Sequence, residues 1–331
     1  MKVKATDIAK RLNLSKATVS LALNNKPGVS QLTKEAVFRC AYEMERELSQ
    51  KKMIRLILLD RGMNIVNGPS QKLLGEDCMA IFERESARMG CSFVINYVDL
   101  KTADIERVVR EANGEDVAGV ILHATEAREE ELEPFFQVRK PMVIYDNDAG
   151  KRYHCVAIDN VAAVREAVDL LVLRGCRDIR YFAHTGEIYN LRQRRAGYRA
   201  GLRKNRLELW EDSIVTIGGG PEEIARNTVA WLKTHEMPDA LILESYLVSI
   251  GVINALRELK VRVPRELSLI GIDELPRHFV QNEFQLTTVK VEHRERAKAV
   301  MMLLEKEMKG EISGKFKVYS NCEVVQGNSI R

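Results

Sequence analysis

Cysteine and histidine, the residue types that most often serve nucleophilic catalysis or metal binding, show no functional spacing in this chain of 331 residues. The six cysteines include no Cys-x-x-Cys pair, and the six histidines have no ligand spacing. Neither Gly-x-Ser-x-Gly nor His-Glu-x-x-His occurs. Gly218–Gly220 lack the Gly-Lys-Ser/Thr of a phosphate loop, which favours an ordinary surface loop. The sequence therefore predicts that the chain is not an enzyme and carries no metal or other cofactor.

The pattern that most clearly indicates a binding function lies in residues 5–24, ATDIAKRLNLSKATVSLALN. Thr6 is suited to cap a first helix, and Asn13 occupies a turn that needs a residue tolerant of positive φ. Ser15 is suited to cap a second helix, and Ser30 to begin a third. Two short helices joined by a tight turn are typical of a helix-turn-helix, whose second helix enters the DNA major groove. A three-helix bundle that binds no nucleic acid is the alternative.

Charge and hydropathy separate this N-terminal head from the rest of the chain. Residues 1–52 hold eleven Lys/Arg and five Asp/Glu, a formal charge of +6, whereas the whole chain carries +4. A basic head on a slightly acidic body indicates a polyanionic partner for the head alone. No apolar run approaches the roughly 20 residues that span a membrane, and the N-terminus lacks the apolar core of a signal peptide. We therefore expect a cytoplasmic protein without a membrane partner.

From residue 54 onward, runs of Val, Ile and Leu alternate with amphipathic helical segments, which predicts an α/β fold with parallel sheets covered on both faces. In open parallel sheets, ligands bind beyond the carboxyl ends of the strands. The polar residues predicted at those ends are Asp60, His123, Asp146, Asn160, His184, Ser245 and Asp273.

The residues from Asp7 to Ser30, DIAKRLNLSKATVSLALNNKPGVS, closely resemble the DNA-binding head of the LacI/GalR family of repressors. The body also resembles that family, with VIYDND, RRAGYRAGL, VPRELSLIGIDE and LTTV in the family order. The resemblance covers nearly the whole chain and implies a two-lobed, periplasmic-binding-protein-like body behind an all-α head. It also implies a homodimeric, sequence-specific transcription regulator, a repressor of a double-stranded operator, controlled by a small-molecule effector such as a sugar or sugar derivative.

On the DNA side, the resemblance places Lys16, Ala17 and Leu21 at base-reading positions of the second helix. Residues near phosphates or at the helix start are then Thr6, Ser15, Thr18, Ser20 and Asn24. Leu21 replaces the usual arginine and Ala17 cannot donate a hydrogen bond, so base readout would depend on Lys16 and on contacts with thymine methyl groups.

On the effector side, the resemblance implies contacts from Asp146, Asn190, Arg194, Ser245 and Asp273. Arg and Asp suit hydroxyl groups or a carboxylate. Ser245 and Tyr246 replace the family's Asn-Asp, and Gly218–Gly220 replace a loop that commonly offers an aromatic ring to a sugar. The alternatives are therefore a regulator with no sugar effector, or a cytosolic or transport-type small-molecule binding protein.

The segment between head and body departs from the family pattern, because the usual Tyr-x-Pro-Asn and hinge-helix sequences are missing. Residues 30–52 contain no Gly or Pro, so one long helix is expected to join the body almost directly. Its apolar stripe, Val37, Ala41, Met44 and Leu48, would pack on the head or body, or would pair with a second copy. The expected domains are the head, 1–52; an N-terminal lobe, 53–158 and 289–318; and a C-terminal lobe, 159–288 and 319–331.

Overall fold

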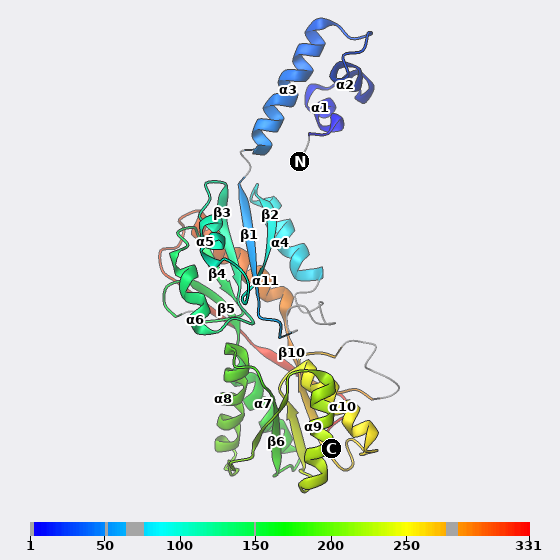
Figure 1. The fold of residues 1–331 in the computed structure, drawn as a ribbon, viewed down its shortest axis with the longest axis vertical. Helices are drawn as coiled ribbons and strands as arrows, with labels where there is room; N and C mark the ends of the chain where they lie inside the picture. Colours follow the sequence, from blue (N-terminus) through cyan, green and yellow to red (C-terminus); the bar gives the residue numbers. More distant parts are fainter. Residues whose placement is uncertain (1–2, 50–51, 64–75, 149, 276–283) are drawn as a thin grey trace.

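The computed structural model describes residues 3–49, 52–63, 76–148, 150–275 and 284–331. A helical head lies beyond one end of a body made of two lobes (Figure 1). The head contains α1 (Ala5–Leu12), α2 (Lys16–Leu23) and α3 (Gln31–Ser49). Its core is formed by buried side chains from all three helices, including Ile8, Val19 and Val37. This arrangement confirms the predicted helix-turn-helix.

The N-terminal lobe is a parallel sheet of six strands in the order β11-β5-β4-β3-β1-β2. Helices α4 and α11 pack on one face; on the other lie α5, α6 and a 3-10 helix at Glu133–Gln137. The elements are β1 (Met53–Asp60), α4 (Glu76–Arg88), β2 (Ser92–Asp99), α5 (Ile105–Ala112), β3 (Val117–His123), α6 (Glu129–Leu132), β4 (Met142–Tyr145), β5 (His154–Ile158), α11 (His293–Met308) and β11 (Lys317–Ser320).

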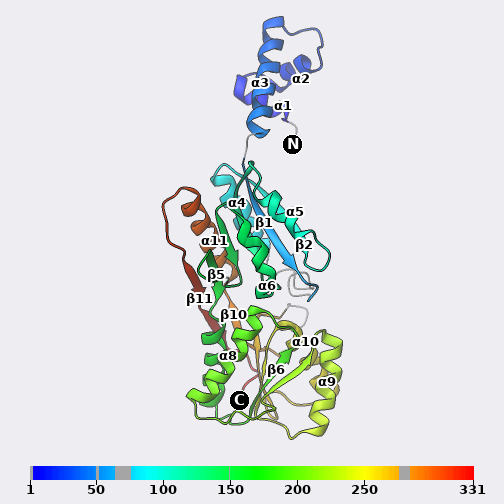
Figure 2. The same cartoon turned by 60° about the vertical axis from the view of Figure 1, so that its left-hand side comes forward.

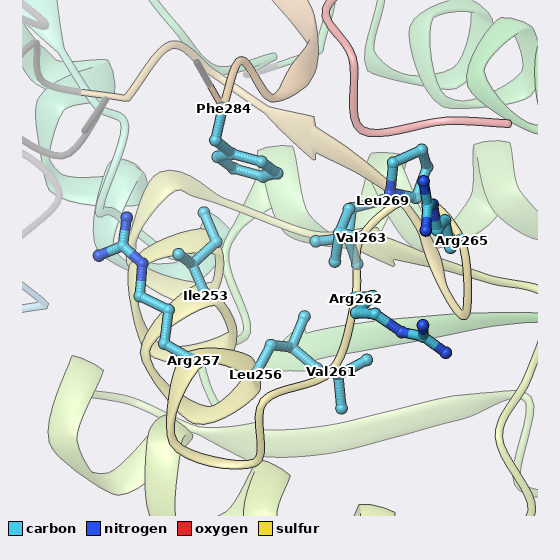
Figure 3. Close-up of a pocket in the computed structure, with 10 residues that line it drawn as sticks. Ile253, Leu256, Arg257, Val261, Arg262, Val263, Arg265, Leu269 and Phe284 are labelled. Atoms are coloured by element: carbon cyan, nitrogen blue, oxygen red, sulfur yellow. The ribbon is translucent and has the colours of Figure 1, made fainter. Parts of the chain in front are cut away.

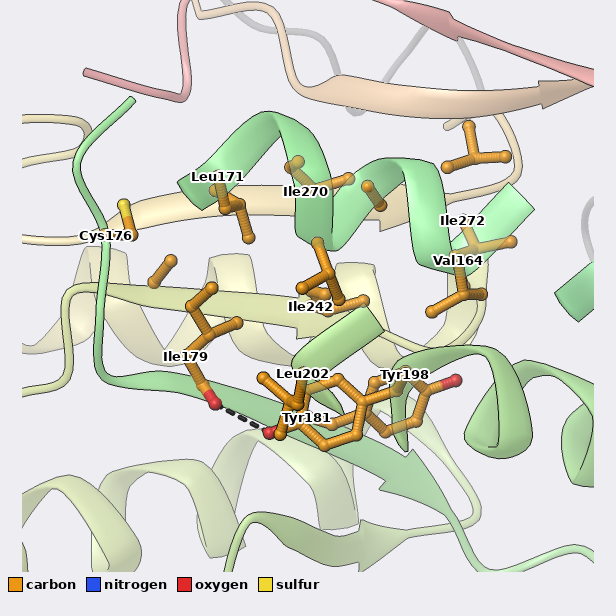
Figure 4. Close-up of a cluster of buried hydrophobic side chains, with 14 of the residues drawn as sticks. Val164, Leu171, Cys176, Ile179, Tyr181, Tyr198, Leu202, Ile242, Ile270 and Ile272 are labelled. Carbon is orange, nitrogen blue, oxygen red and sulfur yellow. Dashed lines mark hydrogen bonds between the residues drawn. The ribbon is translucent and has the colours of Figure 1, made fainter. Parts of the chain in front are cut away.

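The C-terminal lobe repeats this order with β12-β10-β9-β8-β6-β7, in which only the β12–β10 pair is antiparallel. Figure 4 shows α7 and α8 over the buried cluster on one face, where Tyr198 donates a hydrogen bond to the Ile179 carbonyl at 2.6 Å. Helices α9 and α10 cover the other face. The elements are α7 (Asn160–Leu173), β6 (Ile179–His184), α8 (Tyr189–Lys204), β7 (Ile214–Gly218), α9 (Pro221–Thr234), β8 (Ala240–Leu243), α10 (Tyr246–Glu258), β9 (Ser268–Ile272), β10 (Thr287–Val291) and β12 (Cys322–Val325).

The chain passes between the lobes three times, and two of the predicted crossing points are wrong by a few residues. Strand β10 pairs with β9 and β12, so the C-terminal lobe continues to Val291 rather than ending at residue 288. Strand β11 pairs with β5, so the N-terminal lobe's last segment runs to Ser320 rather than to residue 318. Backbone pairing, which the apolar pattern does not specify, sets these boundaries.

The long third helix is present as predicted. Helix α3 runs from Gln31 to Ser49, and β1 begins at Met53. Val37 is fully buried, and Ala41 and Met44 pack against the head's core. These three stripe residues therefore face the head, the first of the two predicted arrangements. The side chain of Leu48 lies outside the described residues.

Candidate DNA-binding head and effector pocket

The second helix of the head is fixed at its start by side-chain hydrogen bonds. The Thr18 amide donates to Ser15 Oγ at 3.0 Å, and the two hydroxyl oxygens lie 2.8 Å apart. Asn13 adopts a φ of 52° at the end of α1, as predicted for the turn. The prediction that Thr6 caps α1 is wrong, because α1 begins at Ala5 and Lys4 is its N-cap residue. Thr6 instead lies exposed within the first turn of α1.

The outer face of α2 is free of contacts with the head's own core. Val19 and Ala22 are buried, whereas Lys16, Ala17 and Ser20 are exposed. The remaining predicted positions are also accessible: Leu21 and Thr18 are partly exposed, and Asn24 is exposed, with its side-chain amide donating to the Ser20 carbonyl at 2.8 Å. The face that a helix-turn-helix inserts into the major groove is therefore available on this chain.

A small pocket lies between the two lobes, and all five predicted effector residues line it. Its cavity volume is about 60 Å³. Four of the five residues stand at or next to the boundaries of regular elements: Asp146 follows β4, Asn190 is the second residue of α8, Ser245 caps α10 and Asp273 follows β9. Arg194 lies one turn further along α8.

Arg194 organises the C-terminal-lobe half of the pocket. Its guanidinium donates to Asn160 Oδ1 at 2.9 Å, to the Glu244 carbonyl at 2.8 Å and to Asp273 Oδ2 at 3.3 Å. Burial by itself lowers the pKa of Arg194, but Asp273 and the other acidic neighbours outweigh it and raise that pKa. Arg194 is therefore a buried cation, and these three hydrogen-bond partners come from its own lobe.

Asp146 organises the N-terminal-lobe half, together with residues that the sequence did not single out. Arg296, on α11, forms a buried ion pair with Asp146, and Thr125 Oγ1 donates to the same carboxylate at 2.7 Å. Burial raises the pKa of Asp146, but Arg296, His123 and Thr125 lower it to a net value below the usual range. His293, the first residue of α11, also lines the pocket. No sequence spacing links Arg296 to a carboxylate 150 positions away.

The two pocket aspartates share an unusual backbone conformation. Asp146 has a φ of 68° and Asp273 a φ of 72°, both in the left-handed region. They also occupy matching places, because β4 and β9 are each third in the strand order of their sheet. Residues held in this region tend to cluster at ligand-binding sites, where the surrounding structure compensates for the strain.

Three other predicted strand-end residues, Asp60, His184 and Asn160, form hydrogen bonds with neighbouring groups of the protein. Asp60 accepts hydrogen bonds from Tyr97 and from the Gly62 amide. The His184 ring donates to the Gly219 carbonyl at 2.8 Å and accepts from the Gly186 amide at 2.8 Å. Asn160 connects two pocket residues, because its side-chain amide donates a hydrogen bond to Asn190 and accepts one from Arg194. Neither Asp60 nor His184 lines the pocket.

A more open groove of about 590 Å³ lies on the C-terminal lobe, at the carboxyl end of α10 (Figure 3). Apolar side chains such as Ile253, Val263 and Phe284 surround it, and Arg262 is paired with Glu266 through two side-chain hydrogen bonds. The groove lacks the converging, buried polar groups of the interlobe pocket. We therefore take the interlobe pocket as the candidate effector site.

The described residues form neither a metal site nor a membrane-spanning helix. No group of His, Cys, Asp or Glu there is arranged to hold a metal ion. No described helix is long and apolar enough to cross a membrane.

The comparisons with known proteins agree with this architecture. Residues 5–45 match the model for bacterial regulatory proteins of the lacI family, and residues 168–330 match a periplasmic binding protein-like domain. The ribose operon repressor of Halalkalibacterium halodurans is 26% identical over 279 residues, which cover 82% of this chain and 80% of that protein.

Two solved structures share the fold over 99% of this chain and 99% of their own chains. One is a complex of the transcriptional regulator CelR with cellobiose, with a TM-score of 0.71 at 21% identity. The other is the lac repressor dimer bound to operator and the anti-inducer ONPF, with a TM-score of 0.71 at 18% identity.

The fold and the two sites thus define a helix-turn-helix, DNA-binding transcription regulator with a periplasmic-binding-protein-like effector domain. The chain belongs to the LacI family of bacterial regulatory proteins. This family consists of transcription regulators and not of enzymes, in agreement with the prediction from the sequence.

Proposed function

We propose that this protein is a homodimeric repressor that binds a pseudo-palindromic operator in the cytoplasm and responds to a small polar effector, a sugar or sugar derivative. The observation that carries the effector half is the convergence of Asp146 and Asp273, one from each lobe, on a single buried pocket. Relatives support the ligand class, since the solved CelR complex contains cellobiose and a related regulator from Weissella paramesenteroides contains glucose.

The pocket also explains how an effector would act on the lobes. Asn190 of the C-terminal lobe lies against Asp146 of the N-terminal lobe, with its Nδ2 3.5 Å from the Asp146 carbonyl. A ligand bound between such residues stabilises the closed arrangement of the two lobes, because it contacts both lobes only when they are close together.

The proposed homodimer has a suitable surface on the N-terminal lobe. Strand β2 is the last strand in that sheet's order, and its side chains Ile95 and Tyr97 are 51% and 50% exposed. Exposed apolar side chains on an edge strand are unfavourable in a monomer and are commonly covered by a partner. Two-fold pairing of the body would hold two heads at the spacing of two operator half-sites.

On the DNA, Lys16 is proposed to contact a base edge, with Ala17 and Leu21 against thymine methyl groups. Ser15, Thr18, Ser20, Asn24 and Thr6 are proposed to lie near the phosphates. Exposure of this face supports the assignment. Because phosphate contacts release counterions, operator affinity is expected to fall steeply with salt.

The connection between head and body is proposed to be a preformed helix rather than a hinge that folds on DNA. The extent of α3, to within a few residues of β1, supports this view. Lobe closure would then move each head as a rigid unit. Hydrogen exchange over residues 40–49 in free protein tests the idea: protection similar to that of α1 and α2 is expected, whereas fast exchange that slows only on operator binding contradicts it.

The function as a whole is tested by binding genomic DNA fragments to the purified protein and repeating the binding with metabolites. We expect selective retention of a few fragments by a dimer, and release or tightening with a metabolite that also raises Tm. A monomer that binds all fragments equally contradicts the proposal.

A further inference from the structure

Within the part of the chain that the structure describes, two buried polar atoms in the N-terminal-lobe half of the pocket have no hydrogen-bond partner: His123 Nδ1 and Arg296 Nε. Both residues line the pocket, and their exposed fractions are only 4% and 2%. Buried polar groups are almost always paired in folded proteins, because an unpaired one destabilises the structure. A bound molecule that supplies the missing partners removes this penalty, so the two atoms indicate the chemistry of the ligand.

The neighbouring hydrogen bonds determine which ring nitrogen of His123 carries the proton. The Thr125 hydroxyl donates to Asp146 Oδ2 at 2.7 Å, because an ionised carboxylate only accepts. Having donated its single hydrogen, Thr125 Oγ1 accepts from His123 Nε2, 3.0 Å away. His123 therefore carries a hydrogen on Nε2.

His123 carries no second ring proton. Burial lowers the pKa of His123 to about 4, so the imidazole is neutral at physiological pH. With its one hydrogen on Nε2, the Nδ1 atom is a lone-pair acceptor that needs a donor. Arg296 Nε has the opposite requirement, because a guanidinium nitrogen only donates.

The charges in the pocket balance without a ligand. Arg194 faces Asp273, Arg296 faces Asp146, and the second pocket histidine, His293, has a pKa that burial lowers. Among the described residues that line the pocket, an anionic ligand would thus find no unmatched cation, and it would lie close to two carboxylates. A carboxylate or a fully ionised phosphate also cannot donate a hydrogen to His123 Nδ1.

From this arrangement we infer that the effector is an uncharged polyol, which donates a hydroxyl hydrogen to His123 Nδ1 and presents an oxygen to Arg296 Nε. This inference rests on the proposed effector-binding function and narrows it. His123 and Arg296 would be specificity-determining residues, which reject the acid and the phosphate ester of the same sugar. A hydroxyl group serves as donor and acceptor at once, so a molecule rich in hydroxyls meets both requirements.

The first experiment measures the Tm of the full chain with a matched panel: D-glucose, D-galactose and D-ribose, each beside its sugar acid and its phosphate ester. At least one neutral sugar is expected to raise Tm, and its charged derivatives to have little effect. The inference is overturned if a charged derivative raises Tm more than its parent, or if no neutral sugar raises it. Operator binding by the same preparation shows separately whether the regulatory function stands.

The second experiment uses deoxyfluoro analogues of the neutral sugar that binds, because fluorine replaces a hydroxyl without donating a hydrogen. When fluorine replaces the hydroxyl that donates to His123, the affinity of the wild-type protein for the sugar is expected to fall tenfold or more. His123→Leu is expected to bind parent and analogue equally. The control is His235→Leu, which changes an exposed histidine that does not line the pocket, and it is expected to behave like wild type.

His123→Asn keeps an acceptor oxygen close to the Nδ1 position and is expected to retain part of the discrimination. If His123→Leu does not fold, His123→Asn still tests the role of His123. A loss of affinity on fluorination that is the same in wild type and in both His123 variants overturns the role assigned to His123.

Discussion

In the head, every side chain proposed to contact DNA comes from residues 6–24, whereas the effector pocket joins segments as distant as Asp146 and Arg296. The head's contact residues are mostly exposed. The charged residues of the pocket are buried and form two ion pairs, Arg194 with Asp273 and Arg296 with Asp146. The difference teaches that a substitution at an exposed head residue such as Lys16 affects binding with little effect on folding, whereas one in the pocket affects binding and folding together.

The largest effect is expected for Arg296→Ala, which leaves the Asp146 carboxylate buried beside a cavity with no counter-charge. Removing one member of a buried ion pair typically costs about 3–5 kcal/mol of unfolding free energy. Urea unfolding measures the loss. The double variant Arg296→Met, Asp146→Asn removes both charges, and asparagine tolerates the positive φ at position 146. Most of the unfolding free energy that Arg296→Ala loses is expected to return in this double variant. Equal losses in both variants would contradict the charge-pair explanation.

The next effect is a pH dependence that belongs to the pocket. Burial lowers the pKa of His123 to about 4, with Arg296 and His293 also lowering it and Asp146 opposing them. Because this value is below the roughly 6.5 of the unfolded chain, the contribution is complete above pH 6.5 and is lost as pH falls towards 4.

The size of this contribution is about 2 kcal/mol between pH 7 and pH 5, from the separation of the two pKa values. Comparing urea unfolding of wild type and His123→Asn at the two pH values isolates it, since other groups titrate in both proteins. If the difference in unfolding free energy between the two proteins does not change with pH, His123 has the same pKa in the folded and unfolded states, which contradicts the prediction.

Local patterns in the sequence predicted the parallel sheets and the strand-end residues Asp146, Ser245 and Asp273. The other two pocket residues, Asn190 and Arg194, were placed by the resemblance to the LacI/GalR family. A buried apolar run followed by a polar residue marks a strand and its carboxyl end, as at Asp146 and Asp273. Arg296 could not be predicted, because its partner is brought close by the third passage of the chain between the lobes. The lobe boundaries near Val291 and Ser320 depend on strand pairing, which single-residue hydropathy does not encode.

In the head, Lys16→Ala is expected to weaken operator binding by about 1–3 kcal/mol while leaving unfolding unchanged. The unfolding curve should stay the same because Lys16 is exposed at the start of α2. Gel shifts on operator and on unrelated DNA separate the two possible contacts. An equal loss on both would assign Lys16 to phosphate rather than to a base. Lys233→Ala, an exposed lysine on α9, removes the same charge far along the chain and is the control.

The smallest effect is expected from Ser15→Ala, which removes the hydroxyl that caps α2 and holds the Thr18 amide at 3.0 Å. Loss of an N-cap typically costs about 1 kcal/mol, because an amide at the helix start loses its acceptor. Hydrogen exchange in the full chain should show faster exchange of α2 amides and unchanged exchange in β4 and β9, since these strands lie in the body. Ser15→Asp supplies a carboxylate at the same position and should restore the protection. Faster exchange in the body strands as well would mean that head and body unfold as one unit, and the contrast between the two regions would then fail.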